Sequence, residues 1–392
     1  MSQRSSEVKV AVTGVTFDTP LILASGYMTE TPGFFLKSIK RGCGCASMVT
    51  RSLKKNPRGE VTSPRYYVSH GADYMLNAEW GNEHPWTRWR DEWVDQVAET
   101  GKPLILSLSG RNTAECAELV SIFDTLPVSA FEINVSCSHS GHIHGNLNVN
   151  IGHVSELIKA IRPNTKKPIW IKLGYSSFLV DMALEAEKHG ADAIVATNSI
   201  GPGLIIDTAS TKPVLGIKGG CGGVTGKAIF PIALQCVWTL RQALSIPVVA
   251  SGGVSNSDET LQMLMAGASA VQLYTEPALR GPKVFSEIMK GLKEYCSAHS
   301  INITDIIGQS LKWADSNHSF TAAPPIVVEA DCTGCGLCAP SCAFGAIRFK
   351  RQGKGQKSIA VIQDNCNTCN ACVGVCPESC IIHEHQNGRD LQ

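Results

Sequence analysis

Several features of membrane, secreted and nucleic-acid-binding proteins are missing from this 392-residue chain. No stretch approaches roughly eighteen consecutive apolar residues, the length of a membrane-spanning helix. Residues 1–14 contain no apolar segment of the kind found in signal peptides. The net charge is only +1 and no basic stripe dominates, which gives no support for a nucleic-acid partner. We therefore expect a soluble, cytoplasmic protein that acts on a small molecule and engages neither membrane nor nucleic acid.

Two further patterns are missing. No G-x-G-x-x-G motif opens a strand–helix–strand unit, so nothing in the sequence is built to bind NAD(P)H. Reducing equivalents are then expected to enter or leave elsewhere. Seven of the sixteen cysteines are scattered over residues 1–330 without a pairing pattern, which suits a reducing compartment better than a disulfide framework. The other nine are concentrated near the C-terminus.

Eight of these nine cysteines repeat one spacing twice. Each copy reads C-x-x-C-x-x-C-x-x-x-C, and Pro377 follows the second. The spacing is typical of proteins with two [4Fe–4S] clusters, in which the fourth thiolate of each copy binds the other cluster. A zinc ribbon is the alternative, but it would leave four of these cysteines unused. The crossed rule predicts one cluster on Cys332, Cys335, Cys338 and Cys376 and the other on Cys366, Cys369, Cys372 and Cys342, with Cys380 left over.

The first 320 residues contain eight short, nearly continuous apolar runs that end in polar or glycine residues. Such runs are typical of parallel strands covered by helices. Helical patterns lie between them, for example at Val154–Ile161 and Leu179–His189. We predict an α/β fold in which the strands close into a (β/α)8 TIM barrel. The predicted strands are Leu21–Ala24, Ala46–Thr50, Leu104–Leu108, Phe131–Val135, Ile169–Leu173, Ala193–Thr197, Pro247–Ala250 and Ala270–Leu273.

A doubly wound open sheet is the alternative architecture, and the missing dinucleotide motif argues against it. Consecutive prolines in Ala322-Ala323-Pro324-Pro325 disfavour helix and are typical of a stiff linker. We therefore predict a barrel over residues 1–320, a linker over residues 321–325 and a small two-cluster ferredoxin-like domain over residues 326–392.

Polar residues gather where the predicted strands end, which is where a parallel barrel carries its active site. Two glycine-rich turns, 219–226 and 251–253, would suit the phosphate of FMN, with ordinary turn chemistry as the alternative. Lys172 would stabilise an anionic reduced flavin or, alternatively, neutralise a core carboxylate. The residues predicted to bind FMN are Ala24, Ser25, Gly26, Thr50, Arg51, Asn134, Lys172, Thr197, Gly222, Gly223, Gly226, Ser251, Gly252, Gly253, Tyr274 and Thr275.

Two segments carry a family resemblance. The segment 197–207, TNSIGPGLIID, with the later Gly222-Gly223 pair, resembles the cytosolic dihydroorotate dehydrogenases, and so does Asn134-Val135-Ser136-Cys137. A barrel followed by a two-cluster ferredoxin module resembles the pyrimidine-reducing part of dihydropyrimidine dehydrogenase. The resemblance covers nearly the whole chain and implies an FMN enzyme that acts on a C=C bond of a pyrimidine-like ring.

The resemblance also implies roles for individual residues. Cys137 would be the general acid or base facing C5 of the ring while the flavin exchanges hydride with C6, and a buried structural cysteine is the alternative. The substrate would be bound by Asn77, Asn134, His139, Asn198 and Ser199, whose amides can match the N–H and C=O groups of the ring.

Three positions depart from the family pattern. Arg51 replaces a usual lysine, and its fixed charge could pair with a substrate carboxylate or with the flavin. Ser138 replaces the expected proline after Cys137 and should loosen the catalytic loop. The segment 139–145 is rich in histidine and would form a solvated lid or, less expectedly, a metal site.

The substrate and the partner stay open at this stage. Asn77-Ala78-Glu79 resembles dihydropyrimidine dehydrogenase, whereas the segment 198–207 resembles dihydroorotate dehydrogenase, and the balance favours a neutral pyrimidine base over dihydroorotate. A ferredoxin-like electron-transfer subunit with a non-catalytic barrel is the third possibility. We expect electrons to pass through the two clusters to an NAD(P)H-oxidising flavoprotein subunit or a soluble ferredoxin, in a homodimer or hetero-oligomer.

Overall fold

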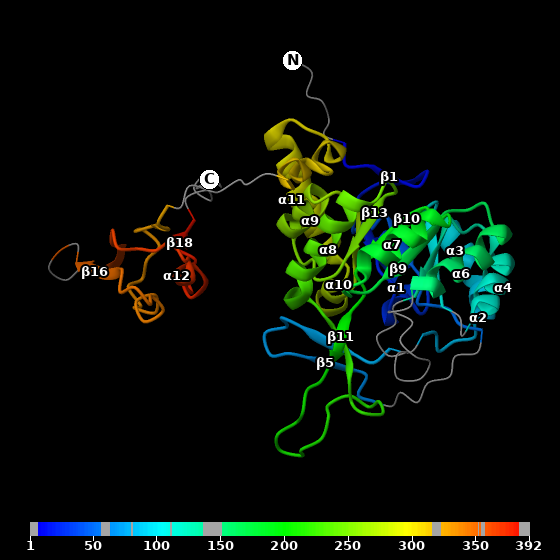
Figure 1. The fold of residues 1–392 in the computed structure, drawn as a ribbon, viewed down its shortest axis with the longest axis horizontal. Coiled ribbons are helices and arrows are strands. Elements are labelled where there is room, and N and C mark those ends of the chain that lie inside the picture. The colour runs from blue at the N-terminus through cyan, green and yellow to red at the C-terminus, as the bar shows by residue number, and fades with distance from the viewer. Residues whose placement is uncertain are drawn as a thin grey trace. The chain divides into compact units, whose positions relative to one another are not determined.

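The structure is a computed structural model that describes residues 7–55, 63–79, 81–109, 112–135, 151–315, 323–351, 353 and 357–383. The chain forms two compact units, Met1–Ala314 and Asp315–Gln392 (Figure 1). The linker predicted at 321–325 is described only at residues 323–325, so its bounds stay a prediction. Among the helices of these ranges, none has the length and apolar character needed to cross a membrane.

Eight parallel strands of the first unit close into a barrel. They pair in chain order, and the last strand returns to the first through Val271–Leu273 and Leu21–Leu23. Each strand lies within two residues of its predicted bounds, so the predicted barrel is confirmed and the open sheet is excluded. The strands are β3 (Leu21–Leu23), β4 (Ser47–Val49), β7 (Leu104–Leu108), β8 (Ala130–Asn134), β9 (Ile169–Leu173), β10 (Ala193–Ala196), β13 (Val248–Ser251) and β14 (Ala268–Leu273).

Helices cover the outside of the barrel (Figure 1). The two helices predicted from periodicity are found as α6 (Ile151–Ile161) and α7 (Leu179–Lys188). Because helices cover one face of the strands and the barrel interior the other, nearly all strand residues are buried and the strands read as continuous apolar runs. The other long helices are α1 (Gly33–Lys40), α4 (Thr113–Asp124), α8 (Phe230–Ala243), α9 (Ser257–Met265) and α11 (Lys283–His299).

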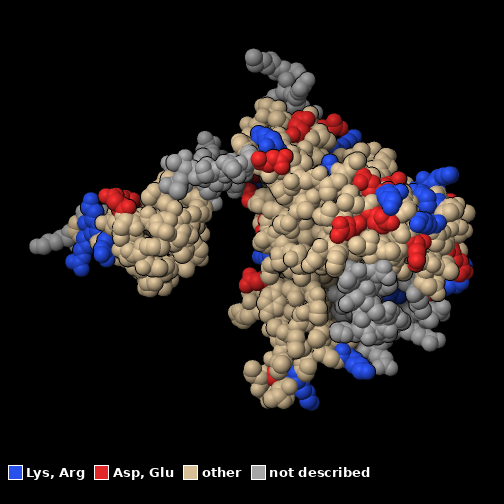
Figure 2. Space-filling view, in the orientation of Figure 1, with Lys and Arg blue, Asp and Glu red and all other residues tan. Residues whose placement is uncertain are grey.

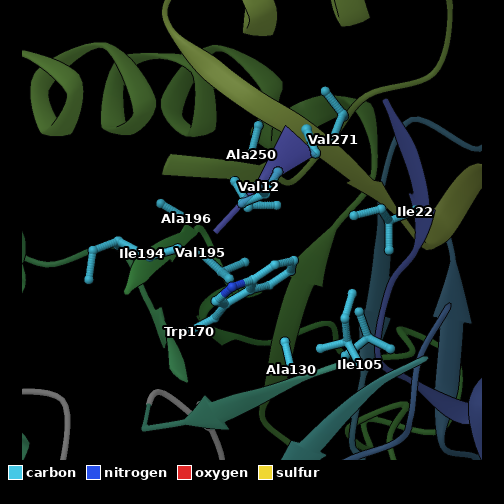
Figure 3. Close-up of a cluster of buried hydrophobic side chains, with 14 of the residues drawn as sticks. Val12, Ile22, Ile105, Ala130, Trp170, Ile194, Val195, Ala196, Ala250 and Val271 are labelled. Carbon is cyan, nitrogen blue, oxygen red and sulfur yellow. The ribbon is translucent and has the colours of Figure 1, made fainter. Parts of the chain in front are cut away.

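An N-terminal hairpin of β1 (Val10–Val12) and β2 (Val15–Phe17) packs at the amino-terminal end of the barrel. Trp170, near the start of β9, lies among Val12, Ile105 and Val195 in the interior (Figure 3). Its indole Nε1 donates to Thr13 Oγ1 at 3.0 Å, which satisfies the polar atom of an otherwise apolar plug. The barrel is therefore filled at this end, and a ligand has room only at the other.

A second, four-stranded sheet is built from the loops that follow β4 and β10. Its strands are ordered β11 (Ile200–Gly203), β12 (Gly222–Thr225), β6 (Met75–Asn77) and β5 (Tyr66–Val68), and it projects from the barrel (Figure 1). The glycine-rich segment predicted as a turn is therefore partly a strand. Glycine is needed at Gly222 because a Cβ there would lie 2.5 Å from the carbonyl oxygen of Asn77.

The second unit contains two small antiparallel pairs, β15 (Ile326–Val327) with β18 (Ile381–Ile382) and β16 (Ile347–Arg351) with β17 (Ser358–Ile362), and the short helix α12 (Ala371–Gly374). Its core combines three cysteines of the repeated motifs and Cys380 with aliphatic side chains, namely Cys332, Cys338, Cys372, Cys380, Ile347, Ile359 and Ile381, and Cys342 and Cys376 pack against it. This unit is the predicted ferredoxin-like domain.

Burial of a thiol near α1 predicts an alkaline weakening of the barrel. Desolvation raises the pKa of Cys45 from 9.0 to about 12, although its Sγ donates to the carbonyl of Ser47. As pH rises, the thiol ionises in the unfolded chain before it ionises in the folded one. Its contribution to the free energy of unfolding is therefore complete below pH 9 and is lost as pH rises toward 12. Between about pH 8.5 and 10.5 the wild type should lose about 2 kcal/mol more unfolding free energy than Cys45→Ala.

Urea unfolding followed by tryptophan fluorescence measures this difference, because all seven tryptophans precede residue 314 and report on the barrel unit. The cavity left by alanine lowers the free energy of unfolding equally at both pH values. The informative quantity is therefore how much the change of that free energy with pH differs between the wild type and Cys45→Ala. Equal slopes for the two proteins would contradict the prediction.

Candidate functional site

A cleft open to solvent, with about 1030 Å³ of empty space, lies at the carboxyl ends of the barrel strands. It brings together four predicted substrate residues, Asn77, Asn134, Asn198 and Ser199. It is also lined by all but three of the residues predicted to bind FMN. These are Ala24, Ser25, Gly26, Arg51, Asn134, Lys172, Thr197, Gly226, Ser251, Gly252, Gly253, Tyr274 and Thr275.

The three exceptions, Thr50, Gly222 and Gly223, do not line the cleft. Thr50 is fully buried, and its Oγ1 accepts a hydrogen bond from the backbone N–H of Ser107 at 2.9 Å, which ties the end of β4 to β7. Gly222 and Gly223 are part of β12, and the carbonyl of Gly223 accepts from Asn77 Nδ2 at 3.1 Å. These residues position the wall of the cleft, and Asn77 in particular.

Three of the predicted substrate residues, Asn134, Asn198 and Ser199, form a connected hydrogen-bond network. Asn198 Nδ2 donates to Asn134 Oδ1 at 3.2 Å, and Asn134 Nδ2 donates to Ser52 Oγ at 3.2 Å. The backbone N–H of Ser199 donates to Asn198 Oδ1 at 2.8 Å. The network orients amide groups from the ends of β8 and β10 toward one space, which suits a ligand with alternating N–H and C=O groups.

Lys172 belongs to a buried polar group inside the barrel. Its Nζ lies 3.5 Å from Glu132 Oε1 and donates to Gln272 Oε1 at 3.2 Å, while Gln272 Nε2 donates to Glu132 Oε2 at 2.7 Å. Neutralisation of a core carboxylate, the alternative considered for Lys172, is therefore present. Because Lys172 also lines the cleft, the same cation can face a ligand there.

Arg51 is held by carboxylates. Its side chain is 3 % exposed, with Nη1 3.0 Å from Glu30 Oε2 and 3.4 Å from Glu83 Oε1, and Nε 3.8 Å from Glu79 Oε2. Its guanidinium also lies 5.7 Å from the ring centre of Tyr27. Three carboxylates thus lie around Arg51, although Glu83 is shared with Arg65, and they reduce what Arg51 can offer to a substrate carboxylate.

Glu79 joins this arginine to two tyrosines. Its Oε1 accepts from Tyr274 Oη at 2.8 Å and also from Tyr66 Oη. Burial, and then the charge of Glu79, raises the pKa of both Tyr66 and Tyr274 well above the ordinary tyrosine value, so both remain donors. Gly26 is required beside them, because a Cβ there would lie 2.1 Å from the Tyr274 ring.

The residues present fit FMN. Gly252 and Gly253 have positive φ of 121° and 79°, and a Cβ on Gly253 would lie 2.5 Å from the backbone nitrogen of Phe230, where α8 begins. This close approach brings a helix N-terminus, which attracts phosphate, to the wall of the cleft. Two buried polar atoms at the cleft, Arg51 Nε and Ser109 Oγ, have no hydrogen-bond partner among the described residues. When bound, FMN supplies hydride transfer and links two-electron to one-electron chemistry.

Sequence reasoning missed several lining residues, including Ser52, Ser109 and Gln272. A usable signal was present for Gln272 and for Glu132, because each is a polar residue inside an otherwise apolar strand. Four tryptophans follow Asn77 closely: Trp89 and Trp93 are buried in the barrel core, Trp86 packs on Phe123, and Trp80 is not described. The three described ones are outside the lining of the cleft.

The catalytic loop falls outside the described residues. Cys137, Ser138 and His139 all lie within 136–150, as do the other histidines of the proposed lid. The loop begins directly after Val135, next to Asn134, which lines the cleft. The roles of Cys137 and His139 therefore stay predictions.

The repeated cysteines surround two separate cavities of the second unit. One, of about 300 Å³, is bounded by Cys332, Cys335, Cys338 and Cys376, together with Cys380. The other, of about 310 Å³, is bounded by Cys342, Cys366, Cys369 and Cys372. Each set contains three thiols of one motif and the fourth of the other, as the crossed assignment requires. Four thiols around one space are the donor set of a [4Fe–4S] cluster. No three His, Cys, Asp or Glu side chains of the described ranges converge on one metal ion.

Comparison with known proteins supports both units. The family model described as Dihydroorotate dehydrogenase matches residues 7–296, and the model described as 4Fe-4S dicluster domain matches residues 331–380. The chain is 35 % identical over 315 residues to the catalytic subunit of dihydroorotate dehydrogenase B (NAD(+)) from Pyrococcus horikoshii, covering 80 % of this chain and 100 % of that protein.

The subunits of the same name from Pyrococcus furiosus and Methanocaldococcus jannaschii are 33 % and 29 % identical, covering 78 % and 77 % of this chain and 99 % and 98 % of those proteins. Because the alignments span nearly all of each relative, the additional length of this chain corresponds to about one fifth of its residues. This chain, an α/β barrel followed by a 4Fe–4S ferredoxin-like domain, belongs to the dihydroorotate dehydrogenase family.

Proposed function

We propose that this chain is an FMN- and iron–sulfur-dependent oxidoreductase that acts on the C5–C6 bond of dihydroorotate, with electrons relayed through two [4Fe–4S] clusters to a partner. The supporting observation is the cleft in which Asn77, Asn134 and Asn198 converge beside the glycine-rich phosphate cradle. The family membership favours dihydroorotate over the neutral base that the sequence alone favoured.

Different residues of the chain bind the ring, exchange the proton, stabilise charge and exclude water. The asparagine network holds the two amide edges of the ring, and Cys137 exchanges a proton at ring C5. Lys172 places a positive charge next to the site of reduction, where it favours developing negative charge. Water is excluded on one side by the sheet of β5, β6, β11 and β12, whose Asn77 and Thr225 line the cleft.

A neutral pyrimidine base is a second candidate substrate, and Arg51 favours it. Glu30, Glu79 and Glu83 already surround this guanidinium, so a substrate carboxylate would approach a site whose local charge is negative. A neutral ring meets no such repulsion. This candidate corresponds to the dihydropyrimidine dehydrogenase type of activity.

An anaerobic assay with an artificial electron acceptor separates the candidates. We expect dihydroorotate to be oxidised at least about tenfold more efficiently than dihydrouracil, because a contact made by only one of two rings commonly changes kcat/KM by this factor or more. The reverse order would favour the neutral base. Failure of both rings to reduce the bound flavin would reject both candidates, and clusters without stoichiometric flavin would leave the non-catalytic barrel as the better description.

A further inference from the structure

The basic residues of the ferredoxin-like domain are segregated. Between residues 323 and 383 every lysine and arginine lies in the ten-residue segment 348–357, at Arg348, Lys350, Arg351, Lys354 and Lys357. The carboxylates of the same stretch, Glu329, Asp331, Asp364 and Glu378, all lie outside that segment. The described part of this region is the pair of strands β16 (Ile347–Arg351) and β17 (Ser358–Ile362), which we call the basic hairpin and which carries Arg348, Lys350 and Arg351 on β16.

The basic hairpin exposes its charges. Arg348, Lys350 and Arg351 are exposed on β16, and Figure 2 shows Lys and Arg side chains gathered at this end of the domain. Within the part of the chain that is described, these three side chains make neither a salt bridge nor a hydrogen bond. Elsewhere many exposed cations pair with glutamate or aspartate, as Arg88 does with Glu92 at 2.9 Å. The charges of Arg348, Lys350 and Arg351 are thus not used to stabilise the fold, whereas Lys357 Nζ donates to the carbonyl of Ala330 at 3.0 Å.

The basic hairpin forms one wall of a cluster cavity. Phe349, between Arg348 and Lys350 on β16, lines the cavity bounded by Cys332, Cys335, Cys338 and Cys376, and so does Ala360 of β17. Phe349 is 38 % exposed, so part of the apolar wall of the cavity reaches the surface. Successive side chains of a strand point to opposite faces, so Phe349 faces the cavity whereas Arg348 and Lys350 lie on the outer face of β16, with the cavity behind the strand.

We propose that the basic hairpin is the docking surface for a small, acidic one-electron carrier protein, which exchanges electrons with the cluster on Cys332, Cys335, Cys338 and Cys376. A positively charged face on the strand that covers the cluster cavity is the complement of an acidic carrier whose own redox centre lies near its surface. The alignments with the relatives named above leave about one fifth of this chain unmatched, a length close to that of this domain.

The electron count of the docking step balances. Oxidation of one ring releases two electrons and two protons, and each carrier accepts one electron as one cluster returns from its reduced to its oxidised state. Two carriers therefore leave reduced for each ring oxidised, and the flow reverses when reduced carriers arrive. The docking surface rests on the proposed electron relay but not on which ring is the substrate.

The test uses the full holoenzyme with clusters reduced chemically, so that no ring substrate is needed. A plant-type [2Fe–2S] ferredoxin is the acidic probe, and cytochrome c, a basic carrier of similar size, is the opposite one. We compare the wild type with the triple variant Arg348→Gln, Lys350→Gln, Arg351→Gln by surface plasmon resonance and by stopped-flow reduction of the probe. The matched control is Lys37→Gln, Lys40→Gln, Arg41→Gln, which removes the same charge from exposed positions at the end of α1.

We expect ferredoxin to associate with the wild type at a rate that falls steeply with salt, and the hairpin variant to associate about tenfold or more slowly at low ionic strength. Iron content and cluster spectra should be unchanged in both variants, and cytochrome c should not bind the hairpin. Absence of ferredoxin binding to the wild type, an unchanged rate for the hairpin variant or an equal loss in the control would each overturn the proposal. None of these outcomes depends on turnover of a pyrimidine ring.

Discussion

The Cys137→Ala variant should turn over its ring substrate roughly two to four orders of magnitude more slowly than the wild type, the range expected for loss of a general acid or base. In the sequence, Cys137 closely follows Asn134 and Val135. Asn134 lines the cleft. The thiol should contact the substrate and neither the phosphate cradle nor the clusters. FMN content, cluster spectra and flavin reduction by an artificial donor should therefore be unchanged.

The matched control for this variant is Cys221→Ala, which removes a thiol from the loop between β11 and β12, outside the residues that line the cleft. It should retain wild-type turnover. Single-turnover flavin reduction by the ring substrate distinguishes the two variants without interference from later electron transfer. Wild-type turnover by Cys137→Ala would show that the proton comes from another group of the loop, with His139 the first to test.

Loss of one cluster thiol should remove about four of an expected eight irons per chain and stop electron transfer to an external acceptor. The crossed arrangement also predicts which of the two clusters each variant loses, which the iron count alone does not. Cys376→Ala should lose the same cluster as Cys335→Ala, because both thiols bound one cavity. Cys342→Ala should lose the same cluster as Cys369→Ala, because they bound the other.

Electron paramagnetic resonance of the reduced chain identifies which cluster remains, and iron analysis gives the number lost. Cys380→Ala is the control, because Cys380 lies at the first cavity, 3.4 Å from Cys376 Sγ, yet stands outside both motifs. It should retain the full iron content. If Cys376→Ala and Cys369→Ala lost the same cluster, each motif would bind its own cluster and the crossed assignment would be wrong.

The barrel could be predicted because its signal is repeated and local. Eight apolar runs separated by helices have few possible closures, and runs such as Ile169–Leu173 are buried on both faces, so every residue contributes to the pattern. The glycine-rich segment 219–226 was predicted less well. Its residues 222–225 pair with β6 and β11, which are distant in sequence, and no local property of a glycine-rich run distinguishes a turn from such a strand.

Only those site residues that directly follow a barrel strand could be predicted to lie together. Residues such as Asn134 and Asn198 follow strands directly, so their meeting at one edge of the barrel was expected, and they are hydrogen-bonded at 3.2 Å. The environment of Arg51 was not expected, because Glu30 comes from the loop after β3 whereas Glu79 and Glu83 come from the loop after β6, and the three carry no shared motif. Whether Arg51 offers its charge to a ligand depends on these contacts and not on its own identity.

The sequence by itself determined the barrel, the two-cluster domain and the residue types at the mouth of the cleft, because periodicity and cysteine spacing are properties of neighbouring residues. Tertiary structure alone decided which charges cancel and which remain exposed. Arg51 is enclosed by carboxylates, whereas Arg348 and Lys350 stand without partners in the described chain. Such pairing depends on distances between segments far apart in the chain, and electrostatic energy follows those distances.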